Sequence, residues 1–202
     1  MVNLIQRNAI AFQKLLHTEY YYCLSLAGKG IEVRLRFQEE DFHHLEGIGQ
    51  LTDLQIHSLG GRKTLSMALN GEITEEDLKK SALFESTRTQ NKIDCLYLLE
   101  TALDHNDLVF RYVIGADGRI KIEASILLYT DVDGNQIYVY IDQEEGRNSD
   151  YYCRSFVANP SFDRKRGLKK MTLLWKEKTD LLTNARTLQY SKEGFTPAQL
   201  RT

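Results

Sequence analysis

The hydrophobic pattern of the chain changes its period near residue 105, and this change constrains the fold most. Between residues 62 and 103 apolar side chains recur at helical spacing, as in Ile93, Leu96 and Leu99. Within this region Thr74, with Asp77 three residues on, predicts a capping box at the start of a helix. Beyond residue 107 they alternate with polar ones in runs that end at Asp, Gly and Asn turns. These runs are residues 108–114, 120–129, 136–141, 151–157 and 171–175. The pattern predicts an α+β fold with helices packed on one face of an antiparallel β-meander.

The N-terminal part predicts a helix followed by a hairpin. Ile5, Ala9 and Phe12 fall on one helical face. Residues 20–26 and 31–37 flank a Gly-Lys-Gly turn, and the second run alternates perfectly between apolar and polar residues. We therefore expect a helix and a β-hairpin to precede the helical segment.

Three segments follow from these patterns. They are an N-terminal helix (residues 1–19), an α+β domain (20–178) and a polar tail (179–202). The tail shows little periodicity, so we expect it to be partly disordered or to dock as a short helix.

Composition excludes several classes of protein. The 202 residues are 42% hydrophobic, which is enough to bury a full core. Cys23, Cys95 and Cys153 are far apart and lie near no histidine at ligand spacing, so we expect reduced thiols and no zinc site. Neither a signal peptide nor a bilayer-spanning run is visible, which predicts a cytoplasmic protein without a membrane partner.

Charge is distributed unevenly along the chain. The formal net charge is −2, but residues 1–150 carry a net −9 and residues 151–202 a net +7. A polyanion would therefore meet the C-terminal part first.

Familiar catalytic motifs are missing from the sequence. It contains no GxxxxGK[ST] phosphate loop, no GxGxxG after a strand, no HExxH and no GxSxG. Residues 131–135 (Asp-Val-Asp-Gly-Asn) resemble the start of a calcium loop, but Gln136 replaces the glycine and Asp142 the glutamate of that motif. A tight hairpin turn is the better interpretation.

Two adjacent histidines are the first candidates for chemistry. His43 and His44 lie between an alternating strand and the glycines Gly47 and Gly49, and imidazoles exchange protons near neutral pH. Neighbouring side chains diverge on a helix or strand, so at most one ring would reach a substrate atom. We expect His44 to face the interior groove and His43 to be more exposed. The structural alternative, a packed ring and a solvated one, is about equally compatible with the residue types.

Cationic side chains supply the other candidates. Arg88 sits in a polar stretch between two helical patterns, where it could bind a phosphate or close a helix end. Residues 164–170 carry five positive charges on an expected loop, which suits a solvated surface or a salt-dependent guide for RNA or DNA. In the preceding strand, alternation predicts that Ser155 shares a face with Cys153, and Arg154 with Phe156.

The order of these pieces points to a known group. The strand leading into residues 42–48, the segment 80–88, and Arg154-Ser155-Phe156 leading through the basic loop to residues 171–175 carry the similarity. The sequence resembles phage-associated nucleases of the Barnase/EndoU/colicin/RelE-like superfamily over residues 20–178.

This resemblance implies a metal-independent ribonuclease without a cofactor. In that chemistry the 2′-hydroxyl of RNA attacks the neighbouring phosphate, which requires a base, an acid and cations. The resemblance makes His44 the general base or acid, with His43 beside it, Arg88 a phosphate clamp and Ser155 a polar group at the sheet end of the cleft. The further substrate-binding candidates are Arg154, Lys121, Arg164, Lys165 and Arg166.

The expected partners are RNA, such as tRNA or mRNA, and an immunity or regulatory protein. Two other functions stay open. The fold could serve as a non-catalytic module for binding nucleic acid or protein, in which His44 and Arg88 only hold the helices together. It could also bind a small regulatory ligand between the helices and the sheet.

Overall fold

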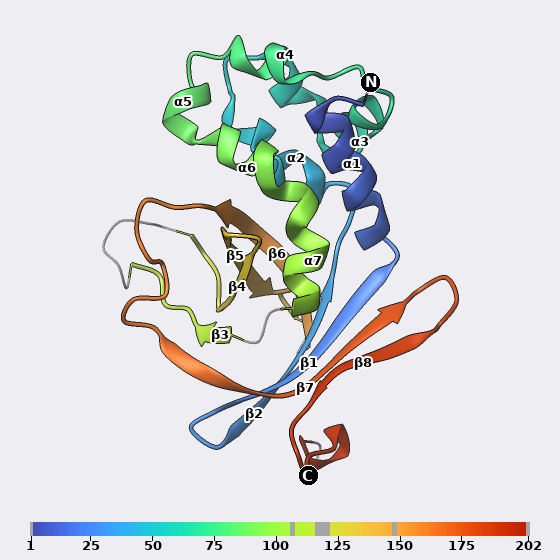
Figure 1. Ribbon diagram of the computed structural model, residues 1–202, viewed down its shortest axis with the longest axis vertical. Coiled ribbons are helices and arrows are strands. Elements are labelled where there is room, and N and C mark those ends of the chain that lie inside the picture. The colour runs from blue at the N-terminus through green and yellow to red at the C-terminus, as the bar shows by residue number, and fades with distance from the viewer. Residues whose placement is uncertain (1, 106–107, 116–121, 147–148, 201–202) are drawn as a thin grey trace.

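The computed structural model describes residues 2–105, 108–115, 122–146 and 149–200. In these residues one mixed β-sheet closes on itself, with helices gathered at one end of it (Figure 1). The strands are β1 Thr18–Leu26, β2 Lys29–Arg36, β3 Leu108–Arg111, β4 Ile126–Val132, β5 Asn135–Gln143, β6 Asp150–Ala158, β7 Lys169–Asp180 and β8 Arg186–Ser191. The α-helices are α1 Leu4–Leu15, α2 Asp41–Leu45, α3 Gly61–Leu69, α4 Glu75–Lys79, α5 Phe84–Thr87, α6 Thr89–Cys95 and α7 Leu99–His105. The 3₁₀ helices are η1 Ile48–Gln50, η2 Gln55–Leu59, η3 Leu96–Leu98 and η4 Pro197–Leu200.

The predicted antiparallel meander with a helical layer on one face is wrong. The described strands form a seven-stranded mixed barrel in the order β1-β2-β6-β5-β4-β3-β7, which the antiparallel pairing of β7 with β1 closes, and β8 extends β7. β2 and β6 run parallel. Alternation tells which side chains of a strand share a face, but it carries no information on the partner strand. Closure satisfies the backbone groups that an open sheet would leave at its edges.

Local sequence signals are confirmed where they concern neighbouring residues. The first hairpin pairs β1 with β2. Thr74 and Asp77 form the reciprocal capping box that starts α4. Asp133 and Gly134 both have positive φ, 51° and 79°, at the turn between β4 and β5. Two such residues make a type I′ turn, which confirms the hairpin in place of a calcium loop.

The polar tail contains a strand that its composition did not indicate. β8 pairs antiparallel with β7 over Arg186–Ser191, and η4 follows it. Most of β8 is exposed, so no apolar period reveals it. Main-chain pairing to a long neighbouring strand is what orders it.

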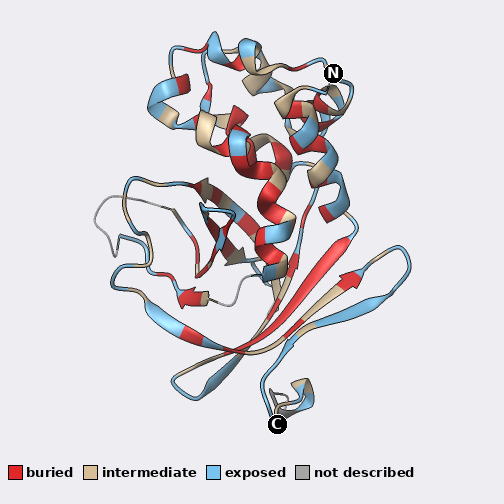
Figure 2. Ribbon diagram, viewed as in Figure 1, coloured by how far each residue is buried: buried red, intermediate tan, exposed pale blue. Residues whose placement is uncertain are grey.

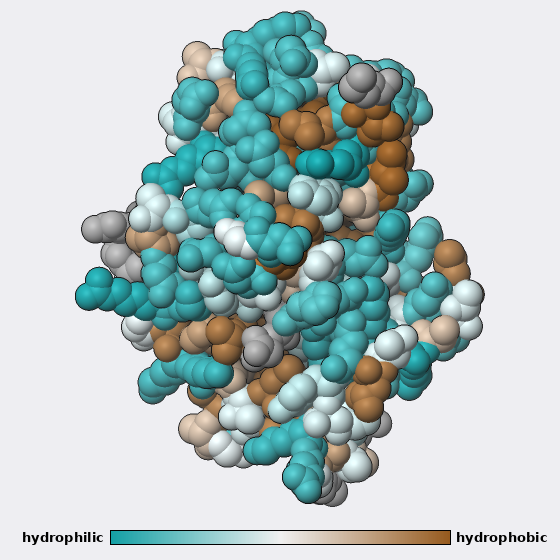
Figure 3. All heavy atoms as spheres, in the orientation of Figure 1, coloured by the Kyte–Doolittle hydropathy of each residue, from teal (hydrophilic) through white to brown (hydrophobic). Residues whose placement is uncertain are grey.

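Two hydrophobic clusters lie on opposite faces of the β4–β5 region. The main core joins the inner face of the barrel to α1, α2, α3, α6 and α7, and it appears in red along β1 and α7 in Figure 2. The second cluster contains Leu127, Tyr138 and Tyr140 on the outer face, where Leu168 packs against it. Burial on both faces explains the dense apolar sequence of β4 and β5. On the surface, hydrophobic side chains gather beside the N-terminus in Figure 3. Val2 and Ile10 are among the exposed hydrophobic residues of the N-terminal segment.

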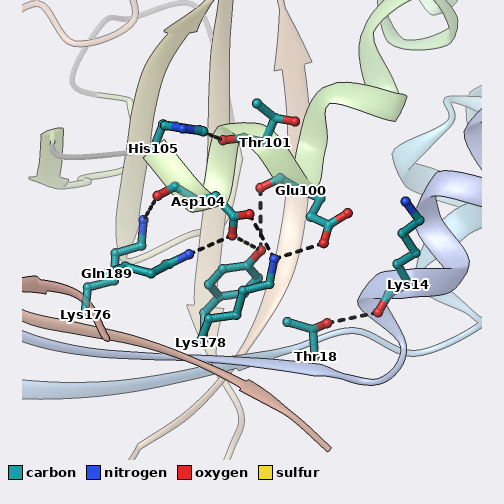
Figure 4. A network of polar contacts seen from close by, with 10 residues as sticks. Lys14, Thr18, Glu100, Thr101, Asp104, His105, Lys176, Lys178 and Gln189 are labelled. Atoms are coloured by element: carbon teal, nitrogen blue, oxygen red, sulfur yellow. Dashed lines mark hydrogen bonds and ion pairs between the residues drawn. The ribbon is translucent and has the colours of Figure 1, made fainter. Parts of the chain in front are cut away.

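A polar cluster ties α7 to the barrel wall (Figure 4). The carboxylate of Asp104 accepts hydrogen bonds from Tyr20 Oη at 2.7 Å and from Lys178 Nζ and Gln189 Nε2 at 2.9 Å each. Lys176 Nζ donates to the Asp104 carbonyl at 2.9 Å, although its residue is only 1% exposed. Burial alone raises the pKa of Asp104, but these donors outweigh it and hold the pKa below its ordinary value. Lys178 is thus matched by two carboxylates, Asp104 and Glu100, within the fold.

One edge of β6 is left open by its neighbour. β2 pairs with only the first three residues of β6, from Asp150 to Tyr152, and the chain then turns into α2. Within the described residues, α2 and α6 pack along the remainder of this edge. The edge is where the candidate site lies.

Candidate nucleic-acid site

A hollow of about 240 Å³ lies between the α5–α6 corner and the second half of β6. We call it the Arg88 pocket. Its lining comes from five separate parts of the chain: the end of η1, the α5–α6 corner with the start of α6, the segment before β4, the second half of β6 and the loop before β7. The lining residues are Gln50, Thr87, Arg88, Asn91, Lys92, Ile122, Ser155, Val157, Ala158, Pro160 and Arg164.

The Arg88 pocket is cationic. Arg88, Lys92 and Arg164 line it, and none of the described residues that line it is acidic. The pocket beside Tyr152 and the one beside Trp175 are lined by both arginines and carboxylates. A pocket with three cations and no carboxylate favours an anion, and a phosphate group fits its chemistry.

Arg88 has a strained backbone conformation at the N-terminus of α6. Its φ is 56° and its ψ is 33°, in the left-handed region that costs a non-glycine residue about 1 kcal/mol. The guanidinium Nη1 donates to Ser161 Oγ at 3.3 Å. The structure thus places the predicted phosphate clamp in the pocket, together with the predicted Ser155.

Ser155 reaches the pocket because β6 is bulged. β5 pairs Tyr140 with Ser155 but Ile141 with Cys153, so Arg154 is an extra residue on β6. Cys153 and Phe156 therefore both point into the main core. The predicted alternation, which placed Ser155 on the face of Cys153, is wrong for this reason.

Arg164 is the one residue of the predicted basic run that lines the pocket. Its Nη1 donates to Tyr140 Oη at 3.4 Å, and its guanidinium lies 5.2 Å from the ring centre of Phe162. Its Nε is buried and finds no hydrogen-bond partner among the residues that the structure describes. A half-buried guanidinium with an unused donor is suited to a ligand oxygen.

Lys92 is the most enclosed cation of the pocket. Its residue is 8% exposed, and its Nζ donates to the His44 carbonyl at 3.0 Å. Burial lowers the pKa of Lys92 to about 8. Its side chain passes over Gly47, whose φ is 91° and where an added Cβ would lie 3.1 Å from Lys92 Cδ. Both the conformation and the close approach suit glycine.

A buried carboxyl group lies near this lysine. Glu46 is fully buried, and its carboxylate accepts hydrogen bonds from Asn8 Nδ2 at 2.9 and 3.1 Å. Burial raises the pKa of Glu46 well above its ordinary value, while the hydrogen bond with Asn8 and the nearby Lys92 oppose the rise. Glu46 and Lys92 are thus close enough for each to shift the pKa of the other.

His44 lies beside the Arg88 pocket but not in its lining. Its Nε2 is 3.1 Å from the carbonyl oxygen of Cys153, on the open edge of β6. Because a carbonyl only accepts, Nε2 carries the hydrogen in this bond and Nδ1 carries the lone pair. Burial lowers the pKa of His44 to about 4, so the ring is neutral at pH 7.

His43 faces a different part of the molecule. Its Nδ1 is 3.0 Å from Thr64 Oγ1 of α3, and its ring centre is 6.2 Å from that of His57. Burial and the neighbouring His57 lower the pKa of His43. The divergence of the two adjacent histidines follows from their places on α2.

The other predicted substrate-binding residues lie outside the pocket lining. Arg154 forms an exposed ion pair with Glu123 at 3.0 Å. Lys165 lies 3.7 Å from the ring centre of Tyr129 and forms an ion pair with Asp163 at 2.9 Å, so it packs on the second cluster. Arg166 is exposed. Lys121 lies outside the described residues.

Lys92 was missed by sequence reasoning, although a signal exists. Thr89, Lys92, Ile93 and Leu96 share one helical stripe, and all four are buried. A lysine on an apolar stripe must be desolvated or hold a polar partner, so it marks a site. In α1, Asn8 breaks the stripe of Ile5 and Ala9 in the same way and reaches Glu46.

The described residues contain no group of three or more His, Cys, Asp or Glu side chains placed to hold a metal ion. Among them, too, no helix has the length and apolar composition needed to cross a bilayer.

Comparison with known families shows which family the protein belongs to. The family model of the phage-Barnase-EndoU-ColicinE5/D-RelE like nuclease4 group matches residues 4–193. The chain belongs to this nuclease-like family. The match includes α1 and β8, which extends the resemblance of residues 20–178 at both ends. No curated protein and no solved structure matches the chain significantly. Membership in a nuclease-like family makes nucleic acid the expected substrate of the protein.

Proposed function

We propose that this protein is an endoribonuclease that holds the scissile phosphate of RNA in the Arg88 pocket. The observation that carries the proposal is the set of three cations, Arg88, Lys92 and Arg164, around one hollow without a lining carboxylate. Membership in a nuclease-like family supports a phosphodiester as the anion.

The proposed reaction is attack of the 2′-hydroxyl on the adjacent phosphorus atom. The 2′-oxygen forms a bond to phosphorus, the bond from phosphorus to the 5′-oxygen breaks, and a 2′,3′-cyclic phosphate and a 5′-hydroxyl result. Arg88 and Arg164 would stabilise the additional negative charge of the phosphorane, and Ser155 would donate a hydrogen bond to one of its oxygens. We propose that this reaction needs no metal ion.

His44 is the proposed general base. Its neutral ring has a lone pair on Nδ1, and Lys92, which lines the pocket, donates to its carbonyl. The position of the ring outside the pocket lining supports a second candidate function, in which the pocket binds RNA without cleaving it and His44 only covers the β6 edge.

One experiment tests the proposal and separates it from binding alone. The purified protein is incubated with total RNA or tRNA in EDTA, and cleavage and cyclic-phosphate ends are measured together with RNA affinity. Cleavage with those ends supports the proposed reaction. Affinity without cleavage under any condition supports the binding module, and neither affinity nor cleavage rejects both.

The His44→Gln variant tests the role of the ring. Glutamine can still donate a hydrogen bond to the Cys153 carbonyl, but it cannot accept a proton at neutral pH. A general base contributes about 10² to 10⁴ in rate, so His44→Gln should lose that factor while keeping most of the stability. Full activity in this variant would show that His44 holds the β6 edge and transfers no proton.

A further inference from the structure

Lys92 combines burial with unused donor capacity. An ammonium group has three N–H donors, and Lys92 makes one hydrogen bond with the described residues, to the His44 carbonyl at 3.0 Å. The residue is 8% exposed, and it lines the Arg88 pocket. A buried cation whose remaining donors have no protein partner is poised for a ligand oxygen.

The other two cations of the pocket cannot transfer a proton. Arginine keeps its proton at any physiological pH, so Arg88 and Arg164 act as fixed charges. Breaking the bond from phosphorus to the 5′-oxygen leaves an alkoxide, which must gain a proton to depart readily. Of the cationic groups that line the described pocket, this leaves the ammonium of Lys92 as the donor.

We infer that Lys92 is the general acid of the site and protonates the departing 5′-oxygen. The inference rests on the proposed ribonuclease function. The proton moves from Nζ to the 5′-oxygen as the bond to phosphorus breaks, which leaves a neutral amine. His44 takes the proton of the attacking 2′-hydroxyl, so the two residues exchange one proton with the substrate in each direction. Solvent returns both residues to their starting states.

The surroundings of Lys92 suit this role. Burial lowers its pKa to about 8, so the group is an ammonium at pH 7 yet a far stronger acid than an exposed lysine. The charged and titratable groups that face it are Glu46 at the end of α2, Cys153 of β6 and Arg164 of the loop. Burial raises the pKa of the Cys153 thiol, so that group stays neutral. Glu46 favours the ammonium form and Arg164 opposes it.

A substrate with a sulfur leaving atom tests the inference. Two RNAs of the same sequence are compared, one with the natural 5′-oxygen at the scissile bond and one with sulfur there. A thiolate departs without protonation, so the sulfur substrate does not need a general acid. Lys92→Met keeps the length of the apolar stem and removes the donor.

We expect Lys92→Met to cleave the natural RNA at least 10²-fold more slowly than the wild-type protein, and the sulfur RNA less than 10-fold more slowly. An equal loss on both substrates would overturn the inference and make Lys92 a charge that positions the phosphate. No loss on either substrate would also overturn it. If the wild-type protein cleaves neither RNA, the proposed function itself fails.

A measurement on the wild-type protein covers the case in which Lys92→Met does not fold. The cleavage rate of the natural RNA should fall as the pH rises through about 8, because the ammonium form is lost. The rate for the sulfur RNA should show no such fall. The same decline for both substrates would contradict a role for Lys92 in leaving-group protonation.

Discussion

Two groups of cationic side chains in this barrel differ in whether carboxylates face them. At the junction of α7 with β7 and β8, Lys178 Nζ meets Asp104 and Glu100 at 2.9 Å each, and Lys176 meets a carbonyl oxygen. In the Arg88 pocket, no carboxylate of the described lining faces the cations. The same protein therefore contains cations paired with carboxylates and cations that line a pocket without one.

The difference separates charges that hold the fold from charges that await a ligand. A buried ion with matched partners is expensive to break, because removing one partner leaves the other uncompensated. A buried ion with unused donors costs stability in the absence of a ligand, and folded proteins keep such groups mainly at functional sites. Changes in the first group should therefore alter stability, and changes in the second should alter activity.

Arg88→Gly should have a large effect on activity and little effect on stability. Loss of one preorganised donor to a transition-state oxyanion lowers kcat/KM by about 10² to 10³. Glycine adopts the left-handed backbone of Arg88 without strain, which offsets the greater freedom that it gives to the unfolded chain. The free energy of unfolding should thus change by less than about 1 kcal/mol. Steady-state cleavage kinetics and urea denaturation measure the two quantities.

A matched control removes an arginine of the same charge elsewhere. Arg186 is 71% exposed and pairs with Glu177 at 3.7 Å on β7. Arg186→Ala should retain cleavage within a few-fold of wild type, since exposed charges act on a polyanion only through the screened field. If Arg186→Ala and Arg88→Gly lose activity equally, net charge rather than the pocket drives the reaction.

Acid titration of His44 should produce the next largest effect. The folded pKa of about 4 lies below the ordinary value of 6.5, so the folded ring resists a proton that the unfolded chain accepts. Stability from this group is complete above pH 6.5 and is lost as the pH falls toward 4. The difference corresponds to roughly 3 kcal/mol. As the pH falls across this range, denaturation should show the wild-type protein losing stability relative to His44→Gln, which has no group to protonate at this position.

The difference between the two proteins isolates the histidine. Burial raises the pKa of Asp41 to about 6, which favours the folded state as the pH falls through the same window. Asp41 is present in both proteins, so its contribution cancels in the difference. Parallel pH curves for wild type and His44→Gln would mean that the ring is not enclosed as the structure indicates.

Asp104→Asn tests the matched group and should reverse the pattern of Arg88→Gly. Asparagine keeps the shape but removes the charge that Lys178 pairs with, and we expect a loss of about 2 kcal/mol in the free energy of unfolding. The cluster shares no residue with the Arg88 pocket, so cleavage per folded molecule should stay the same. A selective loss of cleavage would place Asp104 in a coupled network with the site.

Sequence reasoning succeeded here for interactions between near neighbours. The first hairpin, the capping box at Thr74 and the turn at Asp133-Gly134 depend on residues a few positions apart. Closure of the barrel depends on β1 and β7, whose paired residues lie about 150 positions apart, and alternation gives no partner. One bulge at Arg154 was enough to reverse the predicted face of Ser155.

The candidate site shows the same division. Arg88 and Ser155 were selected from the family resemblance, and they meet in one pocket although 67 positions separate them. His44 was expected to face a groove. Its actual position depends on the end of β2, which stops before Cys153, so that the Cys153 carbonyl is hydrogen-bonded by His44 instead of by a strand. Lys92 belongs to no sequence motif. It becomes a candidate only when the helical stripe of α6 is first predicted to be buried and the lysine on that stripe is then seen to need a polar partner.

Glu123→Gln should give the smallest effect, and it sharpens the boundary of the pocket. The Glu123–Arg154 pair is 70% and 43% exposed, so its loss should change the free energy of unfolding by less than about 0.5 kcal/mol. If Arg154 belongs to the RNA path, as the sequence predicts, release from Glu123 should strengthen RNA binding slightly and add up to about one unit to the salt slope of affinity. Salt-dependent RNA binding by Glu123→Gln measures both. An unchanged slope would confine the RNA contacts to the residues of the Arg88 pocket and leave Arg154 as an ordinary surface charge.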